Sequence, residues 1–186
     1  AQELSDAHVD VMGYACLVAI MSMGRGYHCV SEVNLHQETV ANDFPTPIVT
    51  SAGALINGLK VLGAKQISII TPYMRPLTDM VVDYIEHQGI KVKESIALEI
   101  PDNLEVAAQN PLNLLEIYKQ LDLTDVDVLV VSACVQMPSL EAIDLIQAEC
   151  GIPVTSAAVC TTFEMMKKLG IETKSAIGGE LLNGKY

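Results

Sequence analysis

A run of branched apolar residues followed closely by a thiol is the feature that most constrains this chain. Asp127–Val131 reads Asp-Val-Leu-Val-Val, a composition typical of a strand buried on both faces of a parallel sheet. Ser132 and Ala133 follow, and then Cys134. Residues that follow a parallel strand lie at the edge where open α/β sheets bind ligands. The pattern therefore places Cys134 at a candidate site.

A second cysteine, earlier in the chain, occupies the same kind of position. The segment from His8 to Ala15 is predicted to be a strand that Cys16 closes, so Ala-Cys followed by an apolar residue ends both strands. One buried cysteine is often only a core residue, but two at matching strand ends favour a shared cleft. There, one thiolate can attack an electron-poor carbon while the facing thiol gives or takes a proton. The cysteines at positions 29, 150 and 160 lack this setting.

Strand and helix patterns alternate along the rest of the chain. Strands are expected at 48–50, 65–71, 90–98, 127–131 and 152–155, and helices at 30–42, 54–62, 77–88, 112–121, 140–149 and 158–169. Residues 17–18 are expected to close the first strand, and the glycine-containing stretch 20–26 to be a loop. This alternation predicts an α/β fold with mostly parallel strands.

A short repeat points to an internal duplication. Val49–Ala52 (Val-Thr-Ser-Ala) recurs as Val154–Ala157, and each copy leads into a predicted helix ending in Lys-x-Leu-Gly. Ser51 and Ser156 are the expected N-caps of these helices. The simplest explanation is two similar lobes, each of which brings one cysteine to a shared cleft. We assign residues 1–45 and 160–186 to the first lobe and residues 46–159 to the second.

Composition argues against several classes of protein. The net charge of −12 disfavours nucleic acid and anionic membranes as partners, because both bind basic patches. No window approaches the roughly 18 apolar residues of a membrane span, and the first residues do not resemble a signal peptide. Five cysteines without a CxxC pair fit a reducing, cytoplasmic compartment. The four histidines show no metal-ligand spacing, so no metal is expected.

Two neutral polar residues also follow predicted strands. Tyr73 comes after the strand at 65–71, and Asn103 lies in an expected loop after the strand at 90–98. Both side chains can donate a hydrogen bond to a carboxylate. Spacing alone leaves loop packing for Tyr73, and a turn or cap role for Asn103, equally open.

The cysteine motifs together resemble those of a known family. Ser132–Leu140 (Ser-Ala-Cys-Val-Gln-Met-Pro-Ser-Leu) and Gly13–Cys16 (Gly-Tyr-Ala-Cys) are similar to the motifs of the maleate cis-trans isomerase family, in the aspartate/glutamate racemase superfamily. The resemblance covers essentially the whole chain. It implies two pseudo-symmetric α/β lobes with the active site between them, usually in a homodimer, and no cofactor. Family members begin with a further strand, so the first lobe is expected to lack its N-terminal part here.

The resemblance also implies a reaction and a role for each thiol. The Cys16 thiolate would add to an alkene carbon of maleate, and Cys134 would supply a proton to the neighbouring carbon. The succinyl adduct then has a C–C single bond that rotates, and elimination releases fumarate. Two alternatives stay open: an amino-acid or hydantoin racemase that uses the same thiols as an acid/base pair, and a non-catalytic protein that binds a small ligand.

The family's substrate-binding tyrosine and asparagine match two residues of this chain, Tyr73 and Asn103. In addition, the resemblance implies that backbone amides at Leu17, Val18 and Val135 hold the carboxylates of a small dicarboxylate substrate. Amides and neutral side chains can bind a dianion even in an acidic protein.

Overall fold

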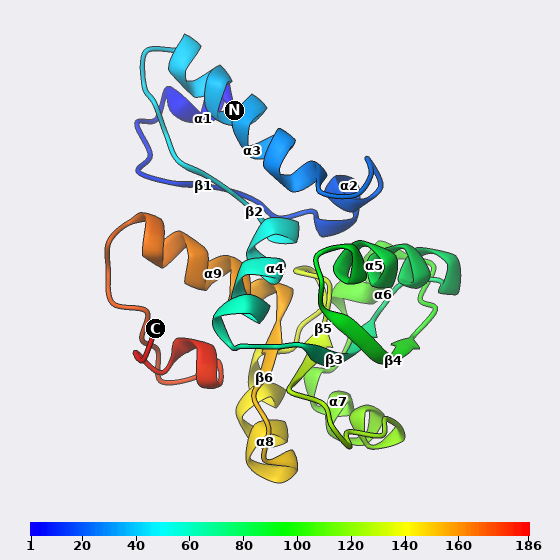
Figure 1. The fold of residues 1–186 in the computed structure, drawn as a ribbon. Coiled ribbons are helices and arrows are strands. Elements are labelled where there is room, and N and C mark those ends of the chain that lie inside the picture. Colours follow the sequence, from blue (N-terminus) through cyan, green and yellow to red (C-terminus); the bar gives the residue numbers. More distant parts are fainter.

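The chain forms two parallel sheets of unequal size, as the computed structural model of residues 1–186 shows (Figure 1). The larger sheet has the order β4-β3-β5-β6, and the smaller one pairs β1 with β2. The strands are β1 (Met12–Tyr14), β2 (Ile48–Thr50), β3 (Gln66–Thr71), β4 (Lys91–Ala97), β5 (Val128–Ser132) and β6 (Val154–Ser156). Every neighbouring pair is parallel, which confirms the predicted α/β class.

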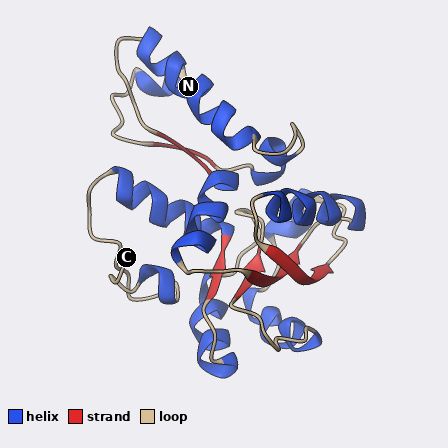
Figure 2. Cartoon of the chain, viewed as in Figure 1, coloured by secondary structure: helices blue, strands red, loops and turns tan.

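Helices connect and cover these strands (Figure 2). They are α1 (Gln2–Ser5), α2 (Leu17–Met21), α3 (Tyr27–Ala41), α4 (Ser51–Val61), α5 (Arg75–His87), α6 (Asn103–Ala107), α7 (Leu114–Ile117), α8 (Leu140–Cys150) and α9 (Ala157–Lys168), with short 3₁₀ turns η1 (Pro111–Asn113), η2 (Tyr118–Gln120) and η3 (Glu180–Leu182). The small sheet, α1 and α3 form the upper part of Figure 1, and the four-stranded sheet lies below them. No helix has the length and apolar character needed to cross a membrane.

The core of the larger sheet is the apolar run that the sequence singles out. Val128, Leu129, Val130 and Val131 are all fully buried, because β5 lies between β3 and β6 and helices cover the sheet. A strand of this kind presents apolar side chains to both faces. It therefore fixes the position at which the following cysteine leaves the sheet.

The region around the first cysteine differs from its prediction in two ways. The strand is short, Met12–Tyr14, and the chain after Cys16 forms the helix α2 instead of extended chain and loop. Leu17, Ile20 and Met21 are all buried on one side of this helix, with the i, i+3, i+4 spacing of a helical face. Packing of this short apolar face stabilises a helix that local sequence signals do not predict.

The predicted duplication corresponds to two similar units, β2–α4 and β6–α9. The hydroxyl of Ser156 caps α9 by accepting a hydrogen bond from the amide of Val159 (3.3 Å). In the first copy the cap is Thr50, which accepts from the amide of Gly53 (3.1 Å), so the prediction of Ser51 was wrong by one residue. The strand β2 pairs with β1, whereas β6 pairs with β5. The division into lobes at residues 45/46 and 159/160 stays a prediction.

Candidate functional site

All seven residues that the sequence singles out line one cavity of about 300 Å³. It lies where the β1–α2 and β3–α5 connections meet α6 and the β5–α8 loop. Its predicted lining residues are Cys16, Leu17, Val18, Tyr73, Asn103, Cys134 and Val135, and they are joined by Ala15, Leu77, Val106 and Gln136. The structure thus brings together residues that are more than a hundred positions apart in the sequence.

The Cys16 thiol lies at the beginning of a helix and is exposed. Cys16 has extended backbone and is the N-cap residue of α2. Leu17 and Val18 occupy the first turn of this helix, where backbone N–H groups have no intrahelical acceptor. Both residues line the same cavity as Cys16, so their N–H groups are candidate donors to an anion bound there.

The Cys134 thiol is buried, with 8% of the residue exposed. A serine two residues earlier fixes its backbone: the Ser132 hydroxyl donates to the Cys134 carbonyl (2.7 Å) and accepts from the Cys134 amide (3.3 Å). Ser132 itself is fully buried at the end of β5. Because both bonds involve one hydroxyl in the core, the turn that presents Cys134 is rigidly placed.

The Tyr73 hydroxyl lies close enough to both cavity thiols for them to affect its pKa. It donates a hydrogen bond to the Ala133 carbonyl (3.1 Å). Burial, and then the nearby Cys134 and Cys16, raises the pKa of this hydroxyl far above its ordinary value. Tyr73 therefore stays protonated and acts as a neutral hydrogen-bond donor at any physiological pH.

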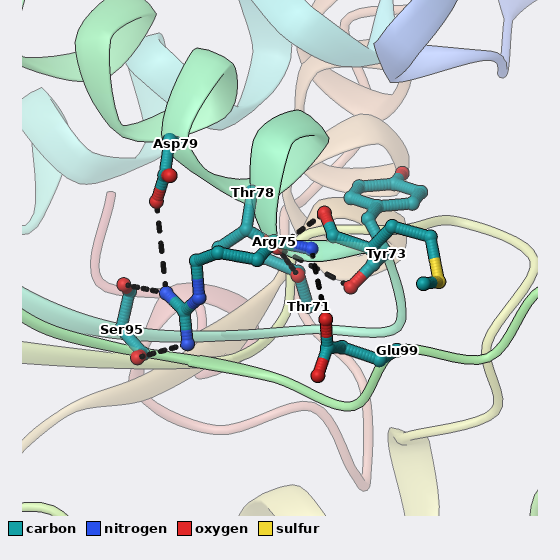
Figure 3. A network of polar contacts seen from close by, with 8 residues as sticks. Thr71, Tyr73, Arg75, Thr78, Asp79, Ser95 and Glu99 are labelled. Atoms are coloured by element: carbon teal, nitrogen blue, oxygen red, sulfur yellow. Dashed lines mark hydrogen bonds and ion pairs between the residues drawn. The ribbon is translucent and has the colours of Figure 1, made fainter.

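A polar network on the opposite side of its backbone holds Tyr73 in place (Figure 3). The hydroxyls of Thr71 and Thr78 share a hydrogen bond of 2.6 Å, and Thr78 also lies 3.4 Å from the Tyr73 carbonyl. Arg75 begins α5 and donates to the Ser95 hydroxyl on β4 (3.0 Å). In Figure 3 the tyrosine ring points away from this network. The strand end is thus anchored, and the phenol lies at the cavity, bonded to the Ala133 carbonyl.

Asn103 lies at the beginning of a helix, and not in the expected loop. It is the first residue of α6, and the Asp102 side chain caps this helix by accepting from the Leu104 amide (2.7 Å). The side-chain amide of Gln136 donates to the Asn103 carbonyl (2.7 Å). Gln136 was not among the residues predicted from the sequence, although this glutamine lies only two residues after Cys134 in the motif.

The remaining thiols lie outside this cavity. Cys160 is fully buried against α4, and burial raises its pKa to about 12, so it stays a thiol. Cys150 is partly buried at the end of α8, and Cys29 is exposed on α3. No group of three or more His, Cys, Asp or Glu side chains is arranged to hold a metal ion.

A larger cavity of about 530 Å³ also borders the Val135–Leu140 segment. Most of its lining residues are apolar and come from the Val135–Leu140 segment, α9 and the C-terminal segment, and Lys174 is its only charged residue. It contains neither a cysteine nor any carboxylate. Of the two cavities, only the smaller is lined by thiols.

Comparison with known proteins identifies the family. A family model described as arylmalonate decarboxylase matches residues 4–182. Maleate isomerases from Geobacillus stearothermophilus and Pseudomonas putida are each 54% identical over 186 residues, which is all of this chain and 74% of theirs. The chain belongs to the maleate isomerase family. The relationship predicted from the two cysteine motifs is therefore confirmed.

Solved structures of maleate isomerases have the same fold. The crystal structure of maleate isomerase Iso from Pseudomonas putida S16 has a TM-score of 0.98 and 58% identity, over all of this chain and 75% of that one. A cysteine-to-serine mutant of the Nocardia farcinica enzyme with a covalently bound succinylcysteine intermediate has a TM-score of 0.94 and 38% identity, over 99% of this chain and 75% of that one. Arylmalonate decarboxylase shares the fold at 17% identity, with a TM-score of 0.80 over 99% of this chain and 78% of that one.

Proposed function

We propose that this protein isomerises maleate to fumarate through a covalent adduct on Cys16. The observation that carries the proposal is the meeting of two thiols in one cavity, Cys16 exposed and Cys134 buried. The first can accept an alkene that enters from solvent. The second is positioned at the inner wall, where it can exchange a proton with the bound substrate.

The reaction needs only these two thiols and proceeds in balanced steps. The Cys16 thiolate attacks one alkene carbon, a C–S bond forms, and the π electrons move to the neighbouring carbon. That carbon takes the proton of Cys134, which gives a succinyl adduct with a C–C single bond. After rotation about this bond, the Cys134 thiolate removes the proton again, the C–S bond breaks, and fumarate leaves with the Cys16 thiolate restored. No step requires a cofactor.

The lining of the cavity suits a small dianion despite the acidic composition of the chain. None of its residues carries a carboxylate, so the only negative group that faces the substrate is the attacking thiolate. Backbone amides at Leu17, Val18 and Val135 can donate to the two carboxylates, as can the Asn103 side chain. The Tyr73 hydroxyl can do so by turning its one hydrogen from the Ala133 carbonyl to the substrate. Because Tyr73 stays protonated, it keeps its donor hydrogen throughout the reaction.

Structures of relatives support the same chemistry. A cysteine-to-alanine variant of maleate isomerase Iso from Pseudomonas putida S16 was solved with maleate. The Nocardia farcinica mutant described above carries a succinylcysteine, the type of adduct that addition of a thiolate to maleate produces. Both agree with a pocket for a cis-dicarboxylate beside a nucleophilic cysteine.

The deciding experiment is proton NMR of maleate incubated with the purified protein, without added cofactor or metal. We expect the maleate singlet to be replaced by the fumarate singlet, and a Cys16→Ala, Cys134→Ala double variant to leave maleate unchanged. Folded protein that produces no fumarate would refute the proposal. Turnover that persists in the double variant would refute the assignment to these thiols.

We also propose that the protein acts in the cytoplasm as a homodimer. None of its five cysteines forms a disulfide, and the mechanism needs both cavity thiols reduced, which the cytoplasm favours. The family resemblance supports the dimer. Light scattering coupled to size exclusion measures the mass in solution, and the mass of a single chain would contradict the dimer.

A further inference from the structure

Few interactions join the short helix α6 to the rest of the molecule. Among its five residues only Val106 is buried, and Leu104 is 78% exposed. All but one of the hydrogen bonds made by these residues stay within 102–109. The exception is the bond from the Gln136 side-chain amide to the Asn103 carbonyl, at 2.7 Å. The position of α6 at the cavity therefore depends on this bond and on Val106.

Gln136 belongs to the same tight segment that presents the buried thiol. Ser132 fixes the backbone of Cys134 at the start of this segment. Tyr73 donates to the carbonyl of Ala133 within it, and Gln136 reaches out from its other end to Asn103. Tyr73, through its side chain, and Asn103, through its backbone carbonyl, are thus both tied to the segment that holds Cys134.

We propose that Gln136 is a positioning residue, which holds Asn103 in place for the substrate and does not act on the substrate itself. This inference concerns the isomerase reaction and so rests on the proposed function. Glutamine suits the task because it offers an uncharged N–H donor on a long side chain. A carboxylate at this position would lack the donor hydrogen and would repel a dianion.

The kinetic consequence follows from the role of Asn103. Its side chain would bind a substrate carboxylate, a group that carries its charge both before and during the reaction. Loosening α6 therefore weakens ground-state and transition-state binding together, which raises KM more than it lowers kcat. Damage to the thiols would have the opposite signature, a loss of kcat.

The test compares the wild type with Gln136→Met, which keeps the length of the side chain and removes its donor. Hydrogen exchange monitored by mass spectrometry reports on α6 directly, and steady-state kinetics with maleate reports on binding. We expect exchange in residues 104–108 to become about fivefold faster and KM to rise about fivefold, the factor that one hydrogen bond of ordinary strength carries. The value of kcat should change less than about twofold.

Two further variants isolate the mechanism. Gln109→Met removes a comparable bond, from a glutamine amide to the Glu105 carbonyl of the same helix (3.0 Å), and should leave KM unchanged. In an Asn103→Ala background, Gln136→Met should have almost no further effect on KM, because the residue that it positions has lost its side chain.

Three results would overturn the proposal: unchanged exchange in α6, a kcat loss without a KM change, or an undiminished effect of Gln136→Met in the Asn103→Ala background. The last would mean that Gln136 contacts the substrate itself. A wild type without isomerase activity would refute the proposed function instead, and the exchange comparison would still decide whether Gln136 holds α6.

Discussion

At the scale of single residues, the two cavity thiols differ most in their surroundings. Cys16 is exposed at the start of α2, whereas Cys134 is buried close to the Tyr73 hydroxyl and its backbone is fixed by Ser132. An exposed thiolate can meet an incoming alkene, and a buried thiol can hold a proton away from solvent. The difference in burial, more than the sequence positions, supports distinct roles for the two.

The first prediction concerns these roles. Cys16→Ser should lower kcat at least about a thousandfold, because a hydroxyl is far less acidic than a thiol and forms no comparable nucleophile near neutral pH. Cys134→Ser should also lose turnover but retain the nucleophile. Intact-protein and peptide mass spectrometry with maleate should therefore show an adduct on Cys16 in this variant and none in Cys16→Ser. An adduct confined to Cys134 in the wild type would reverse the assignment.

The sequence alone pointed to some of these residues and not to others. Both cysteines stand directly after strand patterns, so local signals suffice to find them. Tyr73 and Asn103 needed the family resemblance, because strand-end position does not separate binding from turn formation. Gln136 was missed because its partner lies 33 positions away, and no periodicity reveals a bond from a loop side chain to the backbone of a distant helix.

At the scale of elements, α4 and α9 are the helices that follow the two copies of the short repeat, and they pack against each other in the middle of Figure 1. Their contact depends on a glycine. A Cβ atom placed on Gly58 would lie 2.6 Å from the sulfur of Cys160 and 3.2 Å from the Leu181 side chain. Both of those neighbours are fully buried. The repeat predicted both helices. Their close approach could not be predicted, because it depends on contacts between residues far apart in the sequence, which no local pattern reveals.

The second prediction tests this approach. Gly58→Ala should lower the free energy of unfolding by about 1–2 kcal/mol, because overpacking a buried contact outweighs the gain of about 1 kcal/mol in helix propensity. Adding Cys160→Ala removes the sulfur and should recover part of the loss. Urea denaturation of the two single variants and the double variant measures the coupling. Strictly additive effects would show that the two positions do not interact.

At the scale of the whole molecule, one buried network joins the small sheet to the large one. The Tyr84 hydroxyl of α5 accepts from the His28 amide of α3 (3.1 Å) and lies 2.6 Å from its Nδ1. The Glu32 carboxylate, one turn further along α3, accepts from the amide and the hydroxyl of Thr50 at the end of β2 (3.1 and 2.8 Å). Burial favours the neutral form of the histidine ring, whose Nδ1 can then accept the tyrosine hydrogen. Alternating strand and helix patterns predicted the fold class, but they contain no information about this cross-link.

The third prediction is that the protein loses stability as the pH falls below about 6.5. Burial, assisted by Lys60 and opposed by Glu32, lowers the pKa of His28 from its ordinary 6.5. The unfolded chain therefore takes up this proton first, so the contribution of His28 is complete above pH 6.5 and is lost as the pH falls through the lowered pKa. Thermal denaturation between pH 5 and 8 should show the decline in the wild type and in His87→Gln, which changes an exposed histidine of α5, but a smaller one in His28→Gln. Equal slopes of melting temperature against pH in all three proteins would show that another group takes up the proton. The network would then join the two sheets without making stability depend on pH.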